Sequence, residues 1–207
     1  RSSRPTAACW TSPVAATITS PDLETLPLAK LPPPPVRFLF ADPAHFIACG
    51  CGSGLSPFAP GTAGTAFAWA SYPLLRLAFP ADMLCLAALL LLFAVGVVAC
   101  QITGRNLGVA DHGAIVWDEI VPFWAVLVFL PPALAGLPEG LEVSWRGAAW
   151  QTVAFFLFRF FDIVKPPPAR WFDTRVKNGF GVMMDDVIAA LYTLLALAGL
   201  ARLSGLR

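Results

Sequence analysis

The feature that most constrains this chain is a pair of long runs that contain no charged residue. The runs cover residues 83–103 and 120–138, and each is about as long as the roughly 20 residues that a helix needs to cross the hydrocarbon core of a bilayer. Hydrophobic residues make up 57% of the chain and charged residues 13%, against roughly a quarter charged in soluble domains. These patterns predict an integral membrane protein.

Five apolar segments are candidate helices, at residues 63–79, 83–102, 121–138, 148–164 and 187–203. The first segment contains Pro73 and Arg76, so it is a candidate for a re-entrant helix that does not cross the bilayer. The segments predict an all-α integral membrane fold with about four to five transmembrane or re-entrant helices.

The N-terminal part of the chain differs in composition from the rest. Residues 1–20 are rich in Arg, Ser, Thr and Ala without an acid, and four prolines follow at 32–35. Such a stretch cannot bury a core, so we expect a disordered extension over residues 1–41 and one membrane domain over 42–207. The acid-poor start also fits an organelle transit peptide.

The whole chain has a net charge of +1, which does not suggest binding to nucleic acid. Its five cysteines contain no C-x-x-C pair, so we interpret them as apolar fillers.

Lys and Arg are unequally distributed between the two sides of the predicted bundle. If all five segments cross, residues 1–62, 103–120 and 165–186 share one side, and this side holds most of the cations. Loops rich in Lys and Arg tend to stay in the cytoplasm. We therefore expect this side, which also carries most of the acidic residues, to be cytoplasmic.

A glycine-rich segment precedes the first apolar segment, with GCGSG at residues 50–54 and PGT at 60–62. Glycines let backbone amides converge on an anion, and a helix that begins near Thr62 would direct its positive end at a phosphate. A tight loop with Thr62 as helix N-cap explains the same pattern. The sequence leaves both interpretations open.

Acidic side chains and one histidine collect at the ends of three apolar segments. They are Asp111, His112, Asp118, Glu119, Asp162, Asp185 and Asp186. Ionised carboxylates in a membrane helix are costly unless they are paired or bind a cation. So many oxygen ligands, without a cluster of Cys or His, suit Mg²⁺ better than zinc or copper, and Mg²⁺ suggests a phosphate substrate.

Several of these charges also have simpler explanations. Acids favour a helix N-terminus through its dipole. Arg159 and Asp162, three residues apart, fit a structural ion pair. Lys165 and Arg170 fit anchors at the membrane surface, and Asp173 fits a loop cap or an ion pair.

Four motifs in order resemble those of the phosphatidylglycerophosphatase A family: G-S-G-L-S-P…P-G-T-x-G-T, D-H-G-x-I-V-W-D-E, R-x-x-D-x-x-K-P-x-P-x-R-W-F-D and G-x-G-V-M-x-D-D. The resemblance covers about residues 42–203. It implies a compact helical bundle and a Mg²⁺-dependent lipid phosphatase that converts phosphatidylglycerol phosphate to phosphatidylglycerol and inorganic phosphate. Together with the distribution of Lys and Arg, this leads us to expect a protein of the inner (cytoplasmic) membrane with its active site facing the cytoplasm.

This resemblance leads to a hypothesis for the role of each residue. Mg²⁺ would be held by Asp118, Glu119, Asp162, Asp185 and Asp186. The phosphoryl group would be bound by Lys165, Arg170 and the amides around Ser53, Gly54 and Thr62. Asp111 or His112 would carry a proton to the departing glycerol oxygen. The sequence leaves the oligomeric state open.

A protein of another class remains an alternative, namely a small membrane transporter or a non-catalytic membrane subunit, because acids in membrane helices also mark ion paths. A transporter tends to place its charges near mid-membrane and often contains an internal repeat. Here the charges stand at the ends of the apolar segments, and no repeat is visible. The Asp-Gly-x-x-Ala-Arg signature of lipid headgroup phosphotransferases is also missing from the sequence.

Overall fold

The computed structural model describes residues 32–130 and 145–204, and these residues form helices without a strand among them. The elements are η2 (Val36–Phe38), α2 (Pro43–Ala48), η3 (Gly50–Leu55), α3 (Pro60–Ala78), α4 (Asp82–Leu107), α5 (Trp117–Phe129), α7 (Trp145–Val164), α8 (Ala169–Arg175) and α9 (Gly179–Leu203). The predicted all-α class is confirmed. Most of the expected extension over 1–41 and the end of the apolar segment 121–138 lie outside the described residues.

Three of the described helices, α4, α7 and α9, are long and apolar enough to cross a membrane. The expected count of four to five is not confirmed. Helix α3 forms where the first segment was predicted, with Pro73 inside it. Helix α5 is described over 13 residues, or about 20 Å at 1.5 Å per residue, which is less than the hydrocarbon thickness of roughly 30 Å.

The helices that carry the motifs begin at other positions than the sequence predicts. Helix α3 begins at Pro60 with Ala59 before it, so Thr62 is not its N-cap. Helix α5 begins at Trp117, four residues before the expected apolar segment 121–138, so Asp118 and Glu119 lie in its first turn. Helix α9 begins at Gly179, because the Asn178 side chain caps it by accepting a hydrogen bond from the Gly181 amide at 3.0 Å. The predicted acids at 185 and 186 therefore lie inside α9, in its second turn, and not in a loop before it.

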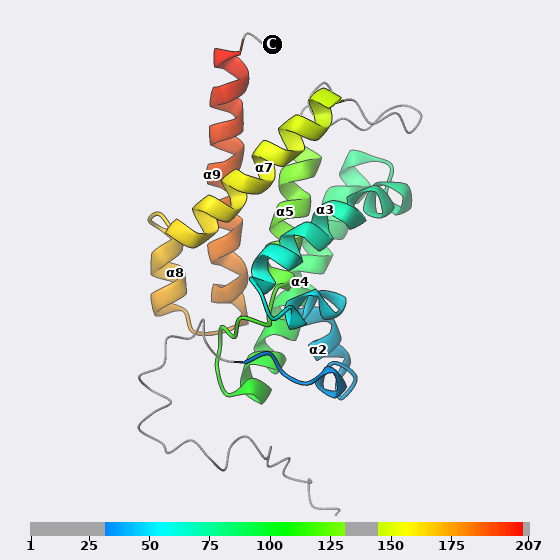
Figure 1. The fold of residues 1–207 in the computed structure, drawn as a ribbon, viewed down its shortest axis with the longest axis vertical. Coiled ribbons are helices and arrows are strands. Elements are labelled where there is room, and N and C mark those ends of the chain that lie inside the picture. Colours follow the sequence, from blue (N-terminus) through cyan, green and yellow to red (C-terminus); the bar gives the residue numbers. More distant parts are fainter. Residues whose placement is uncertain (1–31, 131–144, 205–207) are drawn as a thin grey trace, which may run out of the picture.

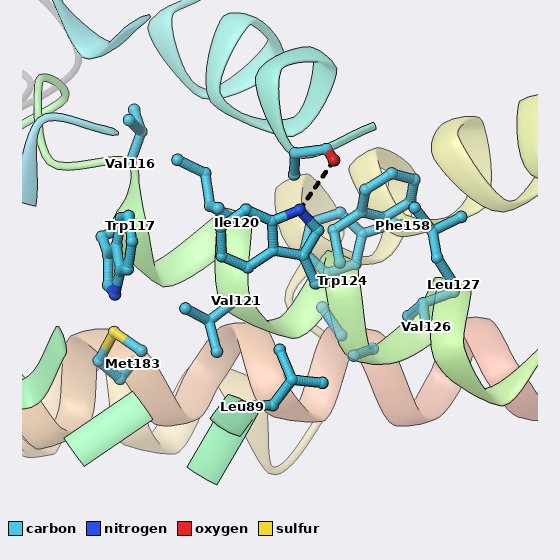
Figure 2. Close-up of a cluster of buried hydrophobic side chains, with 14 of the residues drawn as sticks. Leu89, Val116, Trp117, Ile120, Val121, Trp124, Val126, Leu127, Phe158 and Met183 are labelled. Carbon is cyan, nitrogen blue, oxygen red and sulfur yellow. Dashed lines mark hydrogen bonds between the residues drawn. The ribbon is translucent and has the colours of Figure 1, made fainter. Parts of the chain in front are cut away.

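Helix α5 lies in the middle of the bundle and supplies much of its core. Ile120, Phe123 and Val126 are fully buried. The Trp124 indole points to α3 and donates a hydrogen bond to the Ala68 carbonyl at 2.8 Å (Figure 2). This bond satisfies a polar group that would otherwise be costly to bury. The first turn of α5 is thus fixed in position by the packing of the turns that follow it.

The outer faces of the long helices are apolar. Leu90 and Leu91 on α4, Phe156 on α7 and Leu195 on α9 are each at least 66% exposed. Continuous apolar surface of this kind suits contact with lipid and not with water. Cys49, Cys85 and Cys100 are buried and free, as expected of apolar fillers, whereas Cys51 is exposed and does not fit that expectation.

The helix ends that carry the charged motifs lie in one half of the bundle. Figure 1 shows α7 descending towards α8, and the start of α9 lying beside α8 in the lower half of the molecule. Helix α9 packs against α4, α5, α7 and α8. Acidic residues from α5, α7 and α9 are therefore brought to the same region.

Candidate functional site

The first turn of α5 places two acids side by side. Asp118 is 6% exposed, and its Oδ1 accepts a hydrogen bond from the Glu119 amide at 3.1 Å. The chain before this turn is held by the Val116 amide, which donates to the Ala48 carbonyl at 2.9 Å. The helix dipole favours acids at this end, but neither carboxylate points into bulk water.

Arg159 joins α7 to α5 through two carboxylates. Its Nη1 lies 2.6 Å from Glu119 Oε2 and 2.7 Å from Asp162 Oδ2. The ion pair predicted between Arg159 and Asp162 is confirmed, whereas the pairing with Glu119 was not predicted. The Thr65 hydroxyl of α3 donates to the same Glu119 oxygen at 3.0 Å, so Glu119 links three helices.

Lys165 makes the second cationic centre, directly after the end of α7. Its Nζ lies 2.5 Å from Asp185 Oδ2 and 3.0 Å from Asp173 Oδ1. The ion pair expected for Asp173 is therefore confirmed. Burial lowers the pKa of Lys165, but the charge of Asp185 and its hydrogen bond outweigh burial and raise the pKa above its usual value. Lys165 stays charged and shares its charge between two carboxylates.

Asp185 and Asp186 project from adjacent positions of α9 and are both buried, at 4% and 3% exposed. Asp185 Oδ1 accepts a hydrogen bond from the Asp186 amide at 3.0 Å. Asp186 Oδ1 is buried without a hydrogen-bond partner in the described structure. A buried polar atom without a partner is costly.

Asp111 and His112 lie in the loop before α5. The Ala114 amide donates a hydrogen bond to His112 Nδ1 at 3.1 Å, so the neutral imidazole carries its proton on Nε2. Burial lowers the pKa of His112, although nearby Asp111 opposes this effect. Burial raises the pKa of Asp111, partly offset by Lys165. His112 is thus held neutral, and Asp111 is the better proton carrier of the two.

The glycine-rich segment packs closely on the loop before α5 and on α5 itself. A Cβ at Gly54 would collide with the Ala114 carbonyl, and a Cβ at Gly61 would collide with the Glu119 carboxylate. The Ser53 hydroxyl donates to the Gly50 carbonyl at 2.8 Å, and the Gly54 amide donates to the Cys49 carbonyl at 3.1 Å. These groups are used inside the loop, which favours the tight-loop interpretation over phosphate binding for Ser53 and Gly54.

The remaining predicted phosphate ligands lie at the border of the site. Thr62 is in the first turn of α3, next to Gly61 and hence near Glu119. Arg170 is exposed on α8 and makes no ion pair within 4.0 Å in the part of the chain that the structure describes. Its guanidinium is free to meet a ligand from the surface.

The donor chemistry of the cluster fits a hard cation, because its ligands are carboxylate oxygens and one of them has no partner. The acids are not arranged as a complete cage, however. Across residues 32–130 and 145–204, no three His, Cys, Asp or Glu side chains stand close enough together to hold a metal ion. Instead, two pairs of acids each share one cation: Arg159 bridges one pair, and Lys165 bridges the other.

Thr65 and Arg159 are two members of the site that the predicted ligand set omitted. Thr65 is fully buried and contacts a residue 54 positions away in sequence. No local pattern contains that contact, because it depends on how α3 packs on α5. The i,i+3 spacing revealed one partner of Arg159 but not the one on α5.

An apolar groove of about 430 Å³ lies elsewhere, between α2 and α4. It is lined by Ala44, Ile47, Ala94, Val95, Val98 and Ala99. Because no polar side chain lines it, it has no groups that bind phosphate.

Comparisons with known proteins agree with this picture. Residues 46–201 match the family model described as Phosphatidylglycerophosphatase A. The chain is 42% identical over 154 residues to phosphatidylglycerophosphatase A of Haemophilus influenzae, covering 74% of this chain and 86% of that relative. Identity to the Escherichia coli protein of the same name is 37% over 155 residues, covering 75% and 81%.

A third relative, from Bacteroides thetaiotaomicron, is named "Putative phosphatidylinositol-3-phosphatase" and is 39% identical over 155 residues, covering 73% of this chain and 89% of that protein. No solved structure matches the chain. The family model spans most of the chain and includes all the acidic motifs described above. The chain therefore belongs to the phosphatidylglycerophosphatase A family and is a phosphatase that hydrolyses phosphoric monoesters.

Proposed function

We propose that this protein hydrolyses the phosphomonoester of phosphatidylglycerol phosphate, releasing phosphatidylglycerol and inorganic phosphate, and that it requires Mg²⁺. The observation that carries the proposal is the buried carboxylate cluster formed by α5, α7 and α9, in a chain similar to two proteins named phosphatidylglycerophosphatase A. The unpartnered Asp186 oxygen supports a cation at this cluster.

The cation would be held by residues from the set Asp118, Glu119, Asp162, Asp185 and Asp186. When bound, Mg²⁺ would neutralise phosphate oxygens and lower the pKa of a bound water. Lys165 and Arg170 would hold the phosphoryl oxygens as charge redistributes in the transition state. Lys165 contacts Asp185 inside the cluster, and Arg170 is exposed on α8.

The loop before α5 would assist the departing group. Water attacks phosphorus, the bond from phosphorus to the glycerol oxygen breaks, and that oxygen takes up a proton. Burial raises the pKa of Asp111, so this carboxyl is suited to donate the proton. His112 is held neutral by the Ala114 amide and offers its Nε2–H as a hydrogen-bond donor to the same oxygen.

The location of the site suits a lipid substrate. The acyl chains would stay beside the apolar outer faces of the long helices while the headgroup enters the charged end of the bundle. Exposed cations at this end, namely Arg37, Arg105, Arg170, Arg175 and Lys177, support a cytoplasmic orientation in the inner membrane.

The test is phosphate release by the purified protein in detergent. We expect turnover of phosphatidylglycerol phosphate with Mg²⁺, loss of turnover in EDTA, and recovery when Mg²⁺ is restored. Phosphatidylinositol 3-phosphate is the comparison substrate, because one relative is named for it. Faster turnover of that lipid would contradict the proposed substrate, and turnover that persists in EDTA would contradict the proposed metal.

A further inference from the structure

Three acids are buried in the described structure, and only one of them has a cationic side chain as an ion-pair partner. Asp185 has the Lys165 ammonium at 2.5 Å. Asp118 and Asp186, at 6% and 3% exposed, have no Lys or Arg nitrogen within 4.0 Å among the described residues. Asp118 Oδ1 accepts only the Glu119 amide, and Asp186 Oδ1 has no partner. These two carboxylates therefore have no ion-pair partner within 4.0 Å among the described residues.

The two cations within the cluster already serve other acids. Arg159 contacts Glu119 and Asp162, and Lys165 contacts Asp173 and Asp185. Each cation is thus shared by two carboxylates. Both cations also act on Asp186 through space, but neither makes an ion pair with it within 4.0 Å. A direct counter-ion for the remaining pair therefore has to come from outside these side chains.

The uncompensated acids also act on each other. The carboxylates of Asp162, Asp185, Asp118 and Glu119 all interact electrostatically with Asp186. Burying an ion costs several kcal/mol unless an opposite charge compensates it. Two like charges in one buried region therefore need a cation or a proton between them. Mg²⁺ in proteins is commonly held by one or two carboxylates, with water and substrate phosphate as the other ligands, so two acids suffice.

We propose that Asp118 and Asp186 form the primary divalent-cation site, and that Glu119 and Asp185 act as positioning residues for Arg159 and Lys165. The proposal rests on the proposed function only for the identity of the cation as Mg²⁺. It narrows the five-residue ligand set from sequence to the two buried acids that make no ion pair within 4.0 Å among the described residues.

The proposal predicts opposite effects on the metal-free protein. Asp118→Asn and Asp186→Asn each remove an uncompensated buried charge at constant volume, so the apparent Tm in EDTA rises, on the order of 2–4 °C. Asp185→Asn and Glu119→Gln each take a partner from a partly buried cation, so the apparent Tm in EDTA falls. A simple loss of packing would lower Tm in all four variants.

The deciding measurement is Mn²⁺ binding followed by electron paramagnetic resonance, on the full chain in detergent without lipid. Asp118→Asn and Asp186→Asn are expected to weaken Mn²⁺ binding by at least roughly tenfold, because even the loss of a group that only supports a metal ligand weakens metal affinity by roughly that much. Asp185→Asn is expected to stay within about threefold of wild type. Asp82→Asn is the matched control, because Asp82 is an exposed acid on α4 that pairs with Arg76 outside the cluster.

The proposal is overturned if wild type binds no Mn²⁺, if Asp118→Asn or Asp186→Asn binds it as tightly as wild type, or if Asp185→Asn loses as much affinity as they do. Failure of the proposed function gives a different result. In that case Mn²⁺ binding depends on Asp118 and Asp186 as expected, but the protein does not release phosphate from phosphatidylglycerol phosphate.

Discussion

Replacing Gly54 by alanine tests whether the glycine-rich segment serves packing or phosphate binding. A Cβ at Gly54 would collide with the Ala114 carbonyl oxygen and lie 3.0 Å from the Ala114 carbonyl carbon. These are backbone atoms of the loop that leads into α5, so they cannot rotate away as the end of a flexible side chain can. The two segments have to separate for the methyl group to fit.

The expected cost of Gly54→Ala is that of overpacking a filled core, about 1–3 kcal/mol. At roughly 2–4 °C per kcal/mol for a chain of this size, the apparent Tm falls by about 2–12 °C. Gly199→Ala is the matched control, because nothing lies within 4 Å of its Cβ position in α9. Alanine in a helix interior is more favourable than glycine by roughly 0.5–1 kcal/mol, so this variant keeps or slightly raises Tm.

The assay is thermal unfolding in detergent at one scan rate, with phosphatase kinetics on the same preparations. Packing predicts a lower Tm for Gly54→Ala, with loss of activity that follows loss of folded protein. A variant that melts like wild type but has a strongly raised KM would refute the packing argument. It would show that this segment contacts the phosphate directly.

Three further predictions concern the charged residues and the topology. Lys165→Met leaves Asp185 buried without its cation, so we expect destabilisation of about 3–5 kcal/mol in urea or thermal unfolding; a change below 1 kcal/mol would contradict the ion pair. Asp118→Asn and Asp186→Asn should purify as folded protein and lose orders of magnitude in kcat, whereas Asp173→Asn, at a partly exposed acid beside Lys165, should lose much less; equal activity in all three would refute the site. Cysteines introduced at residues 108–110 and 175–178 should be labelled from the same side of the membrane in intact cells, and labelling from opposite sides would contradict a single site.

The sequence predicted the parts of this structure that depend on residue type and order. Charge-free runs of membrane length predict helices, and α4, α7 and α9 are such helices. Acids at the ends of these runs have to lie near a membrane surface, so their gathering at one end of the bundle follows from where the runs stop. The order of the motifs was enough to indicate the family.

The positions at which helices begin were predicted less well, because local side-chain contacts decide them. The Asn178 side chain starts α9 seven residues before Asp185, and Pro60 starts α3 before Thr62. A hydrophobicity pattern does not detect a cap at a polar residue outside the apolar run. The start of α9 therefore lies more than two turns before the apolar segment 187–203, so Asp185 and Asp186 stand inside the helix, whereas the start of α3 moved by only two residues.

The pairing of the charges was decided only by the tertiary structure. The sequence placed Glu119, Asp185 and Asp186 in one class of candidate ligands. In the fold, Glu119 accepts a hydrogen bond from Thr65 and pairs with Arg159. Asp185 pairs with Lys165, whereas Asp186 has an oxygen without a hydrogen-bond partner. Ion pairs and hydrogen bonds form over about 3 Å, and this distance depends on how each helix is rotated and shifted against its neighbours. The residue order specifies which charged groups reach the site, but it does not specify how the helices are rotated. Only the tertiary structure therefore determines which of these groups are paired and which remain free to bind a ligand.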